Sequence, residues 1–173
     1  MIDDFTHLLA YKLQGDARDA QIALQCIAPM VQAPQRRHAL RLAVGRLLPH
    51  LVAYVLASAK APDAQTVLAL DQLVGILATL DDKAAALCIV LPVLAAAVER
   101  PPAEAALREQ ACAHLVRLAQ SYPTHLKTAL ASLPAHTRTL LHDALRQAMG
   151  LAHGPPRAAP KSEARIALKT FGS

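Results

Sequence analysis

Hydrophobic residues recur at spacings of three and four along most of this chain, a period typical of helices with one buried face. Residues 63–80 show it most clearly, because Val67, Leu70, Leu73 and Leu77 fall on one side of a helix. Before the last residues of the chain there is no sustained alternation of the kind that predicts strands. We therefore predict seven or eight helices, over residues 2–13, 16–32, 36–60, 63–80, 83–99, 101–121, 123–132 and 135–149.

The ends of these helices carry recognisable signals. Pro62-Asp63 combines a proline that ends one helix with an aspartate that caps the next, and Asp81-Asp82 begins another helix with acidic residues. Gly150 is expected to cap the last helix at its C-terminus. Short connections between long helices place consecutive helices antiparallel to each other.

An internal repeat is visible in two of the helices. Leu47-Leu48-Pro49-His50-Leu51-Val52 resembles Val90-Leu91-Pro92-Val93-Leu94-Ala95, and the two prolines are 43 residues apart. HEAT and armadillo units recur at about 40–47 residues and stack into solenoids. The alternative is chance, with two kinked helices in an ordinary bundle. We predict an all-α fold over residues 1–150, a right-handed α-solenoid of HEAT-like antiparallel helix pairs. Two copies of the repeat are visible and a third is partial. This part of the chain is therefore expected to be the end of a longer repeat array.

Composition narrows the fold and the function further. Hydrophobic residues make up 54% of the 173 residues and aromatic residues only 3%, so the core must consist mostly of Ala and Leu, which favour helices over sheets. The scarcity of aromatic residues also argues against modules that stack nucleic-acid bases. The net charge of +5 is spread thinly, unlike the basic stripe of a DNA-binding domain, and we expect no nucleic-acid partner.

Cysteine usage and hydropathy favour a cytoplasmic protein. Cys26, Cys88 and Cys112 are an odd and widely spaced set, unlike the disulfide framework of a secreted domain. Each lies in an apolar helical stretch, so we expect all three to be reduced core residues. The N-terminus lacks the features of a secretory signal. The longest apolar run, residues 84–98, is shorter than the roughly 20 residues of a membrane-spanning helix.

The sequence contains no local signature of catalysis or cofactor binding. The six glycines form neither GxGxxG nor a Gly-rich loop before Lys-Ser/Thr, and HExxH and GxSxG are absent. Among eight histidines the closest Cys/His pair is Cys112 and His114, and residues two apart on a helix do not face each other. We expect exposed or satisfied surface histidines, no metal, no cofactor, no small-molecule substrate and no enzyme activity. Spacing alone neither supports nor excludes a Ser/His/Asp triad.

The C-terminal third resembles a known family. It contains Ser121-Tyr122-Pro123-Thr124-His125-Leu126-Lys127 and then Leu133-Pro134-Ala135-His136-Thr137-Arg138, similar to the closing helices of HEAT solenoids. Together with the strand-like ending at residues 164–171, these segments resemble the C-terminus of the HEAT repeat-containing protein 5 family. Importin-type karyopherins with a similar closing helix are the alternative. The ending Ile166-Ala167-Leu168-Lys169 favours the first family.

The resemblance implies a function without catalysis. Members of that family are large accessory proteins of a clathrin adaptor complex, so the implied protein is a cytoplasmic scaffold recruited to trans-Golgi and endosomal membranes. Its implied partners are clathrin adaptors and accessory subunits, with peripheral membrane association. The karyopherin alternative implies the C-terminal part of a nuclear transport receptor. Neither resemblance assigns binding residues to positions of this chain.

Residues 151–173 are predicted to form a Pro-rich linker and a flexible basic tail. Three prolines prevent a helix between residues 154 and 160, and the last seventeen residues contain four cations and one acid. In an extended segment Ile166 and Leu168 fall on one side and Arg165 and Lys169 on the other. An ordinary frayed terminus is the alternative interpretation. The candidate contacts with a partner are Arg157, Lys161, Arg165, Ile166, Leu168 and Lys169.

Overall fold

The computed structural model describes residues 2–33, 37–57 and 63–150, which form eight α-helices and one 3₁₀ turn and contain no β-strand. Each predicted helix is present, with ends shifted by a few residues at most. The helices are α1 (Ile2–Leu13), α2 (Ala17–Gln32), α3 (Arg37–Ala57), α4 (Asp63–Ala78), α5 (Lys83–Val98), α6 (Ala105–Ser121), α7 (Pro123–Ser132) and α8 (Ala135–Ala148), and the 3₁₀ turn η3 (Pro102–Glu104) precedes α6.

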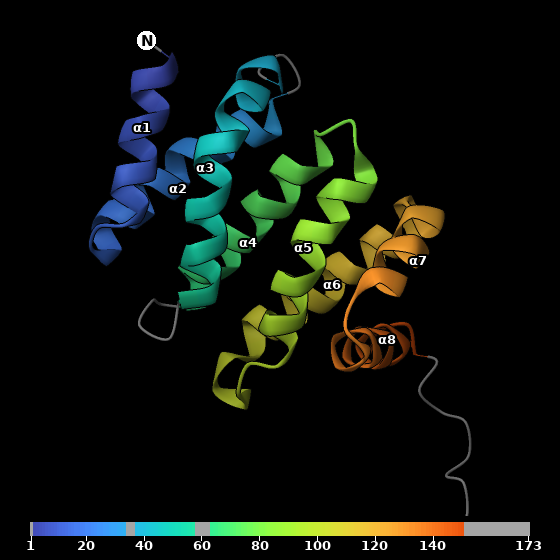
Figure 1. Ribbon diagram of the computed structural model, residues 1–173. Coiled ribbons are helices and arrows are strands. Elements are labelled where there is room, and N and C mark those ends of the chain that lie inside the picture. Colours follow the sequence, from blue (N-terminus) through green and yellow to red (C-terminus); the bar gives the residue numbers. More distant parts are fainter. Residues whose placement is uncertain (1, 34–36, 58–62, 151–173) are drawn as a thin grey trace, which may run out of the picture.

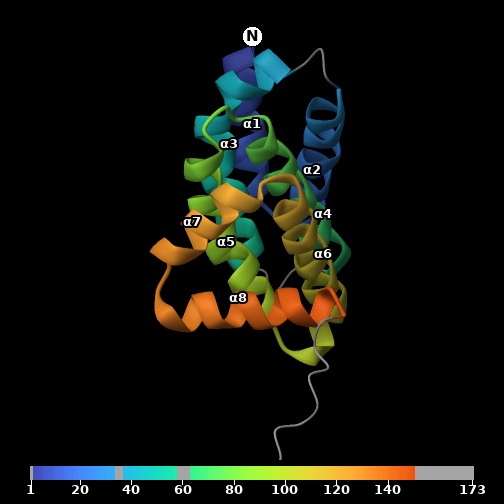
Figure 2. The ribbon, with the colours of Figure 1, turned by 90° about the vertical axis from the view of Figure 1, so that its right-hand side faces the viewer.

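The helices stack in two layers (Figure 1). One layer contains α1, α3, α5 and α7, each packed against the next, and the other contains α2, α4 and α6. Figure 2 shows the two layers from the end of the stack, on either side of the core. The pairs α1–α2, α3–α4 and α5–α6 also pack across the layers. The arrangement confirms the predicted helical solenoid, since each pair is covered by its neighbours.

The last two helices depart from this pairing. Helix α8 runs crosswise below the layers in Figure 2, where it packs against both α5 and α6 and much less against α7. The connection between α7 and α8 is Leu133-Pro134, and both residues have extended backbones, with ψ of 155° and 147°. A helix placed across the end of the stack covers apolar surface that a further repeat would cover elsewhere in a solenoid.

The repeated prolines lie where the internal repeat predicts them. Pro49 is inside α3 and Pro92 is inside α5, which are neighbours in the same layer, and both prolines are on the exposed side of their helices. A proline removes one backbone donor and bends a helix, and the solvent-exposed side tolerates the loss because water satisfies the freed carbonyl. The resemblance between the two segments is therefore a structural repeat.

The core is made of aliphatic side chains, and α5 lies at its centre. Residues on nearly all sides of α5 are buried, from Ala86 to Val98, because α3, α4, α6, α7 and α8 surround this helix. The predicted contact of residues 36–60 with the two following helices is confirmed, since α3 packs on α4 and α5. Leu51 of α3 is fully buried in this contact. Helices that are apolar all round are stable only in such fully covered positions.

Two of the predicted helix caps are present, and the predicted cap at Asp63 stays a prediction. The carboxylate of Asp82 accepts a hydrogen bond of 3.0 Å from the backbone N–H of Ala85 at the start of α5, as expected for an N-cap. Asp63 begins α4. Gly150 follows α8 with a φ of +68°, a left-handed conformation that glycine adopts without strain. Asp82 of the predicted Asp81-Asp82 start is thus the N-cap of α5.

Two predictions about single residues were wrong. Cys88 is exposed on α5, because it falls on the one side of that helix that faces solvent, whereas Cys26 and Cys112 are half-buried against the core as predicted. His114 is not a surface histidine, since its exposed fraction is 4%. It occupies a core position of α6 seven residues after the buried Leu107, and its hydrogen bonds are satisfied there.

Candidate interaction surfaces

The predicted contact residues of the tail lie outside the residues that the structure describes. Arg157, Lys161, Arg165, Ile166, Leu168 and Lys169 therefore stay a prediction. The separation of residues 151–173 from the helical part and the flexibility of the tail also stay predictions. Within the described residues the candidate surfaces are a polar groove in the layer of α2, α4 and α6, a small apolar cavity, and a groove between α7 and α8.

A polar network joins α4 to α6. The carboxylate Oδ1 of Asp71 on α4 accepts hydrogen bonds from Gln110 Nε2 and from His114 Nε2 on α6, each 2.6 Å long. On its other side, the ring of His114 contacts the guanidinium of Arg117, with 2.8 Å between Nη2 and Nδ1. The network thus runs from the half-exposed Asp71 through the buried histidine to the exposed Arg117.

The geometry of this network defines the state of His114. A guanidinium can only donate, so Nδ1 of His114 accepts from Arg117 and carries no proton, which leaves the proton on Nε2 to be donated to Asp71. The ring is therefore neutral. Burial lowers the pKa of His114 below its usual 6.5, the hydrogen bond to Asp71 opposes this, and the charge of Arg117 lowers it further. A neutral histidine in a saturated network has no free base for proton transfer.

The network forms one wall of a groove of about 330 Å³ between α2, α4 and α6. Gln72 lies at its floor with an exposed fraction of 3%, and its Nε2 donates a 2.6 Å hydrogen bond to the backbone carbonyl of Leu24. Its Oε1 has no hydrogen-bond partner among the described residues. Helices α2 and α4 approach closely here because residue 75 is glycine. A Cβ atom at this position would lie 2.4 Å from Cγ1 of Val31.

The residues of this groove are suited to binding through hydrogen bonds. The groove presents the amides of Gln32 and Gln110, the carboxylate of Asp71 and the guanidinium of Arg117 beside apolar side chains. It contains no cysteine or hydroxyl nucleophile among its described lining residues. Hydrogen-bond donors and acceptors in an open, partly apolar groove are typical of surfaces that bind peptide segments.

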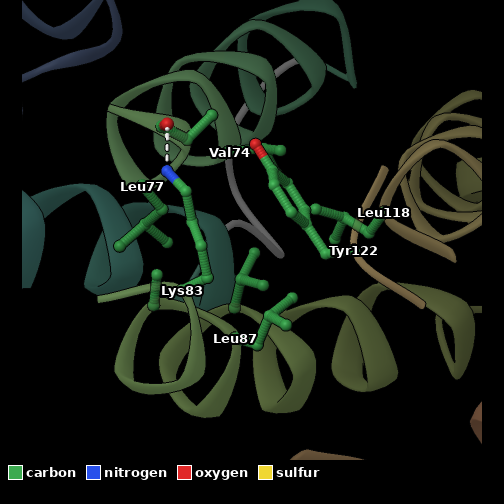
Figure 3. A pocket seen from close by; sticks show the side chains of 9 residues that line it. Val74, Leu77, Lys83, Leu87, Leu118 and Tyr122 are labelled. Atoms are coloured by element: carbon green, nitrogen blue, oxygen red, sulfur yellow. Dashed lines mark hydrogen bonds between the residues drawn. The ribbon is translucent and has the colours of Figure 1, made fainter. Parts of the chain in front are cut away.

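A second, small cavity lies between α4, α5 and α6 (Figure 3). It is lined by apolar side chains that include Val74, Leu77, Leu87 and Leu118, and its volume is about 20 Å³, room for about one water molecule. Figure 3 shows that its sides carry two polar groups, Lys83 and Tyr122.

Both polar groups at this cavity have structural roles. The ammonium of Lys83 donates to the backbone carbonyls of Ala78 and Leu80 and therefore caps the C-terminal end of α4. The same ammonium lies 5.4 Å from the centroid of the Tyr122 ring, a cation–π distance. Because its donors are used and the space is small, this cavity is part of the packing between repeats and not a ligand site.

The described residues contain no group of three or more His, Cys, Asp or Glu side chains placed to hold a metal ion. No helix in the described part of the chain is long and apolar enough to cross a membrane. Burial raises the pKa of the Cys112 thiol, which disfavours the reactive thiolate.

Sequence reasoning did not find the polar network or its groove. A signal was present, because Asp71 and Gln72 interrupt the apolar face of α4, and His114 follows Leu107 by two helical turns on the apolar face of α6. A polar residue at a core position indicates a buried hydrogen bond. Its partner on another helix was not predictable from the spacing, because 43 residues separate Asp71 from His114.

Comparison with known proteins identifies one family. Residues 1–156 match the family described as LAA1-like, C-terminal TPR repeats. No curated protein and no solved structure matches the sequence significantly. The family match extends over all of the described helices, so it concerns the whole solenoid and not only the C-terminal third.

Proposed function

Because the chain belongs to the LAA1-like family through its C-terminal TPR repeats, we propose that it is a non-catalytic scaffold for clathrin adaptor-dependent vesicle traffic between the trans-Golgi network and endosomes. The LAA1-like family is the HEAT repeat-containing protein 5 family that the sequence resembles. The proposed partners are clathrin adaptor complexes and their accessory subunits. The proposed location is the cytoplasm, with recruitment to the surface of these membranes.

The single observation that carries the proposal is the family match over residues 1–156, the entire stack of helices. Helical repeat solenoids act by presenting extended surfaces to other proteins. In this chain the α2, α4 and α6 layer presents such a surface, with the polar groove at Asp71, Gln110 and Arg117. This groove is the candidate contact surface for the adaptor partner.

A capture experiment with defined proteins tests the proposal. The full chain is immobilised and presented with purified clathrin adaptor complex or, in a parallel sample, with a Ran-type GTPase. We expect retention of the adaptor complex and not of the GTPase, because the resemblance to karyopherins is the weaker one. Retention of the GTPase alone would replace the traffic proposal with the nuclear-transport alternative, and retention of neither would refute both.

A matched pair of variants tests the groove. Gln32→Trp places a large side chain at the exposed rim of the groove without removing a hydrogen bond of the network. Gln120→Trp makes the same change at an exposed position of α6 outside the groove lining. We expect adaptor capture to be lost with the first variant and kept with the second. Equal capture by both variants would show that the adaptor binds elsewhere on the solenoid.

A further inference from the structure

The geometry points to a second binding site, the groove between α7 and α8, which takes an acidic amphipathic helix of a partner protein. The inference rests on the proposed function only as far as this chain is a protein-interaction scaffold. It concerns a different surface from the polar groove of α2, α4 and α6. The occupant is defined by its chemistry, a helix with apolar side chains on one face and carboxylates beside them.

The first observation is an unfilled helix position. Helices α1, α3 and α5 each pack against the helix that follows them, but α7 packs much less against α8, because α8 crosses below α5 and α6 instead. A groove of about 440 Å³ remains between α7 and α8 with Ala119 of α6 at its side. Among the described residues α7 lacks the following helix as a close partner, which α1, α3 and α5 each have, and the groove lies beside α7 where such a helix would pack.

The second observation is the chemistry of the groove lining. Its deepest residues are apolar, with Leu126 and Leu130 on α7 and the half-buried Leu145 on α8. These side chains offer contacts to leucine-like residues at helical spacing on a partner. Apolar side chains of the partner would lose water on entering the groove, which is the main source of affinity in helix-in-groove complexes.

The third observation is the charge around the groove. Among the described residues its lining includes Lys127, Arg138 and His142 but no carboxylate. Lys127 and His142 are exposed and form no hydrogen bond or ion pair with another described residue. To the described residues Arg138 donates a single long hydrogen bond of 3.5 Å, which goes to the backbone carbonyl of Ala131. Between residues 123 and 150 the single acid is Asp143, which is exposed on α8 outside the groove lining.

This charge selects the occupant. A groove with cations at its rim attracts carboxylates and repels basic segments, which gives specificity and a faster encounter with an acidic partner. The basic tail of this chain, with four cations and one acid in its last seventeen residues, has the wrong sign for the groove. An acidic helix from another protein is therefore favoured over the chain's own C-terminus.

The test uses the full chain and a labelled peptide of about 15 residues, the length at which an isolated helix becomes marginally stable in water. The peptide carries Leu at positions i, i+3, i+4 and i+7 and Glu at most other positions, and a second peptide has Lys in place of every Glu. Fluorescence anisotropy measures binding. We expect the Glu peptide to bind, with affinity that falls as salt is raised, and the Lys peptide not to bind.

Paired variants locate the site. The double variant Lys127→Glu with Arg138→Glu reverses two charges at the groove, and Arg18→Glu with Arg108→Glu reverses two exposed charges on α2 and α6. We expect the first to weaken binding of the Glu peptide by at least about tenfold and the second to leave it nearly unchanged. Ala131→Trp, at an exposed lining residue, fills the groove without a change of charge and should also abolish binding.

Several outcomes would overturn the inference. They are equal binding of the two peptides, no binding of the Glu peptide, and equal losses in the two double variants. If deletion of residues 157–173 strengthens peptide binding more than tenfold, the tail of this chain occupies the groove. If self-association of the chain disappears in the Lys127→Glu/Arg138→Glu variant, a second copy of the chain occupies it. Adaptor capture is scored separately. A chain that binds the peptide but no adaptor refutes the traffic proposal alone, and the reverse result refutes this site alone.

Discussion

The dipeptide Leu-Pro occurs both in the centre and at the C-terminal end of the solenoid, but it lies inside a helix in the centre and ends a helix at the C-terminal end. Leu48-Pro49 and Leu91-Pro92 lie inside α3 and α5, whereas Leu133-Pro134 ends α7 and turns the chain into α8. Proline pushes the preceding residue toward an extended backbone. In the centre, packing against helices on both sides keeps Leu48 and Leu91 helical. At the end α7 has fewer neighbours, and Leu133 adopts the extended conformation that proline favours.

The same difference in packing decides how much each region buries. Helix α5 buries residues on nearly all sides, while α8 buries only Leu141 and Ala144. Stability is therefore concentrated in the centre of the stack, and the end retains exposed polar and cationic side chains around an open groove. A region with fewer buried contacts is the one that can accept a partner with the least loss of packing.

The largest expected effect is at the centre. Leu51→Asp places an unpaired charge at a fully buried position of α3, so we expect a loss of more than about 4 kcal/mol or complete unfolding. Leu140→Asp on α8 should cost less, because this side chain is only partly buried. Leu56→Asp, at a side chain that is 45% exposed in the same helix as Leu51, is the control. Thermal melts followed by circular dichroism measure all three, and similar losses at Leu51 and Leu56 would contradict the observed packing.

The next effect concerns the polar network between α4 and α6. The unfolded chain binds a proton at its histidines near pH 6.5, but folded His114 has a lowered pKa and stays neutral. The folded state therefore binds fewer protons below pH 6.5, and its stability falls as the pH drops through that window. We expect this drop to be smaller in His114→Gln than in the natural chain. Melting temperatures at about pH 7.5 and 5.5 measure it.

A control for this prediction is His125→Gln. His125 is exposed on α7 and has no hydrogen bond or ion pair with another described residue, so the variant should keep the full pH dependence. An equal loss of stability in His114→Gln and in the natural chain would show that the neutral state of the buried ring does not contribute to folding.

A smaller effect, with opposite signs, is expected at the two prolines. Pro92→Ala restores a backbone donor inside α5, so we expect the free energy of unfolding to rise by about 1 kcal/mol. This is part of the roughly 3 kcal/mol that proline costs inside a helix. The native backbone at residue 134 already suits proline, and Pro134→Ala gives the unfolded chain more conformational freedom. We therefore expect the free energy of unfolding to fall by about 0.4–1 kcal/mol. Chemical denaturation measures both. Changes of the same sign would contradict the different roles assigned to the two prolines.

The smallest effect on the fold is expected from the tail. Deletion of residues 157–173 should change the free energy of unfolding by less than about 0.5 kcal/mol, because it removes no residue of the described core. If the tail contacts a membrane surface, its four cations should each contribute about 1 kcal/mol to binding of anionic liposomes at low salt. Liposome sedimentation at low and moderate salt measures this. Unchanged binding at both, with unchanged helicity, would leave the tail as a passive terminus.

The sequence by itself determined the helices and their caps. The spacing of Ala and Leu, the aspartates at helix starts and Gly150 at the end of α8 are local signals, and local signals act through backbone hydrogen bonds within a few residues. The spacing between Pro49 and Pro92 also identified the repeat, because a solenoid places equivalent residues at a constant distance along the chain. These features do not depend on contacts between distant segments.

Only the tertiary structure decided which surfaces can bind. The hydrogen bond between Asp71 and His114 and the close approach of Gly75 to Val31 join residues that are more than 40 apart in sequence. The exposure of Cys88 and the crosswise position of α8 depend on which neighbours a helix has and not on its own pattern. The groove between α7 and α8 exists for the same reason, because the chain turns at Leu133-Pro134 and α8 then packs on α5 and α6.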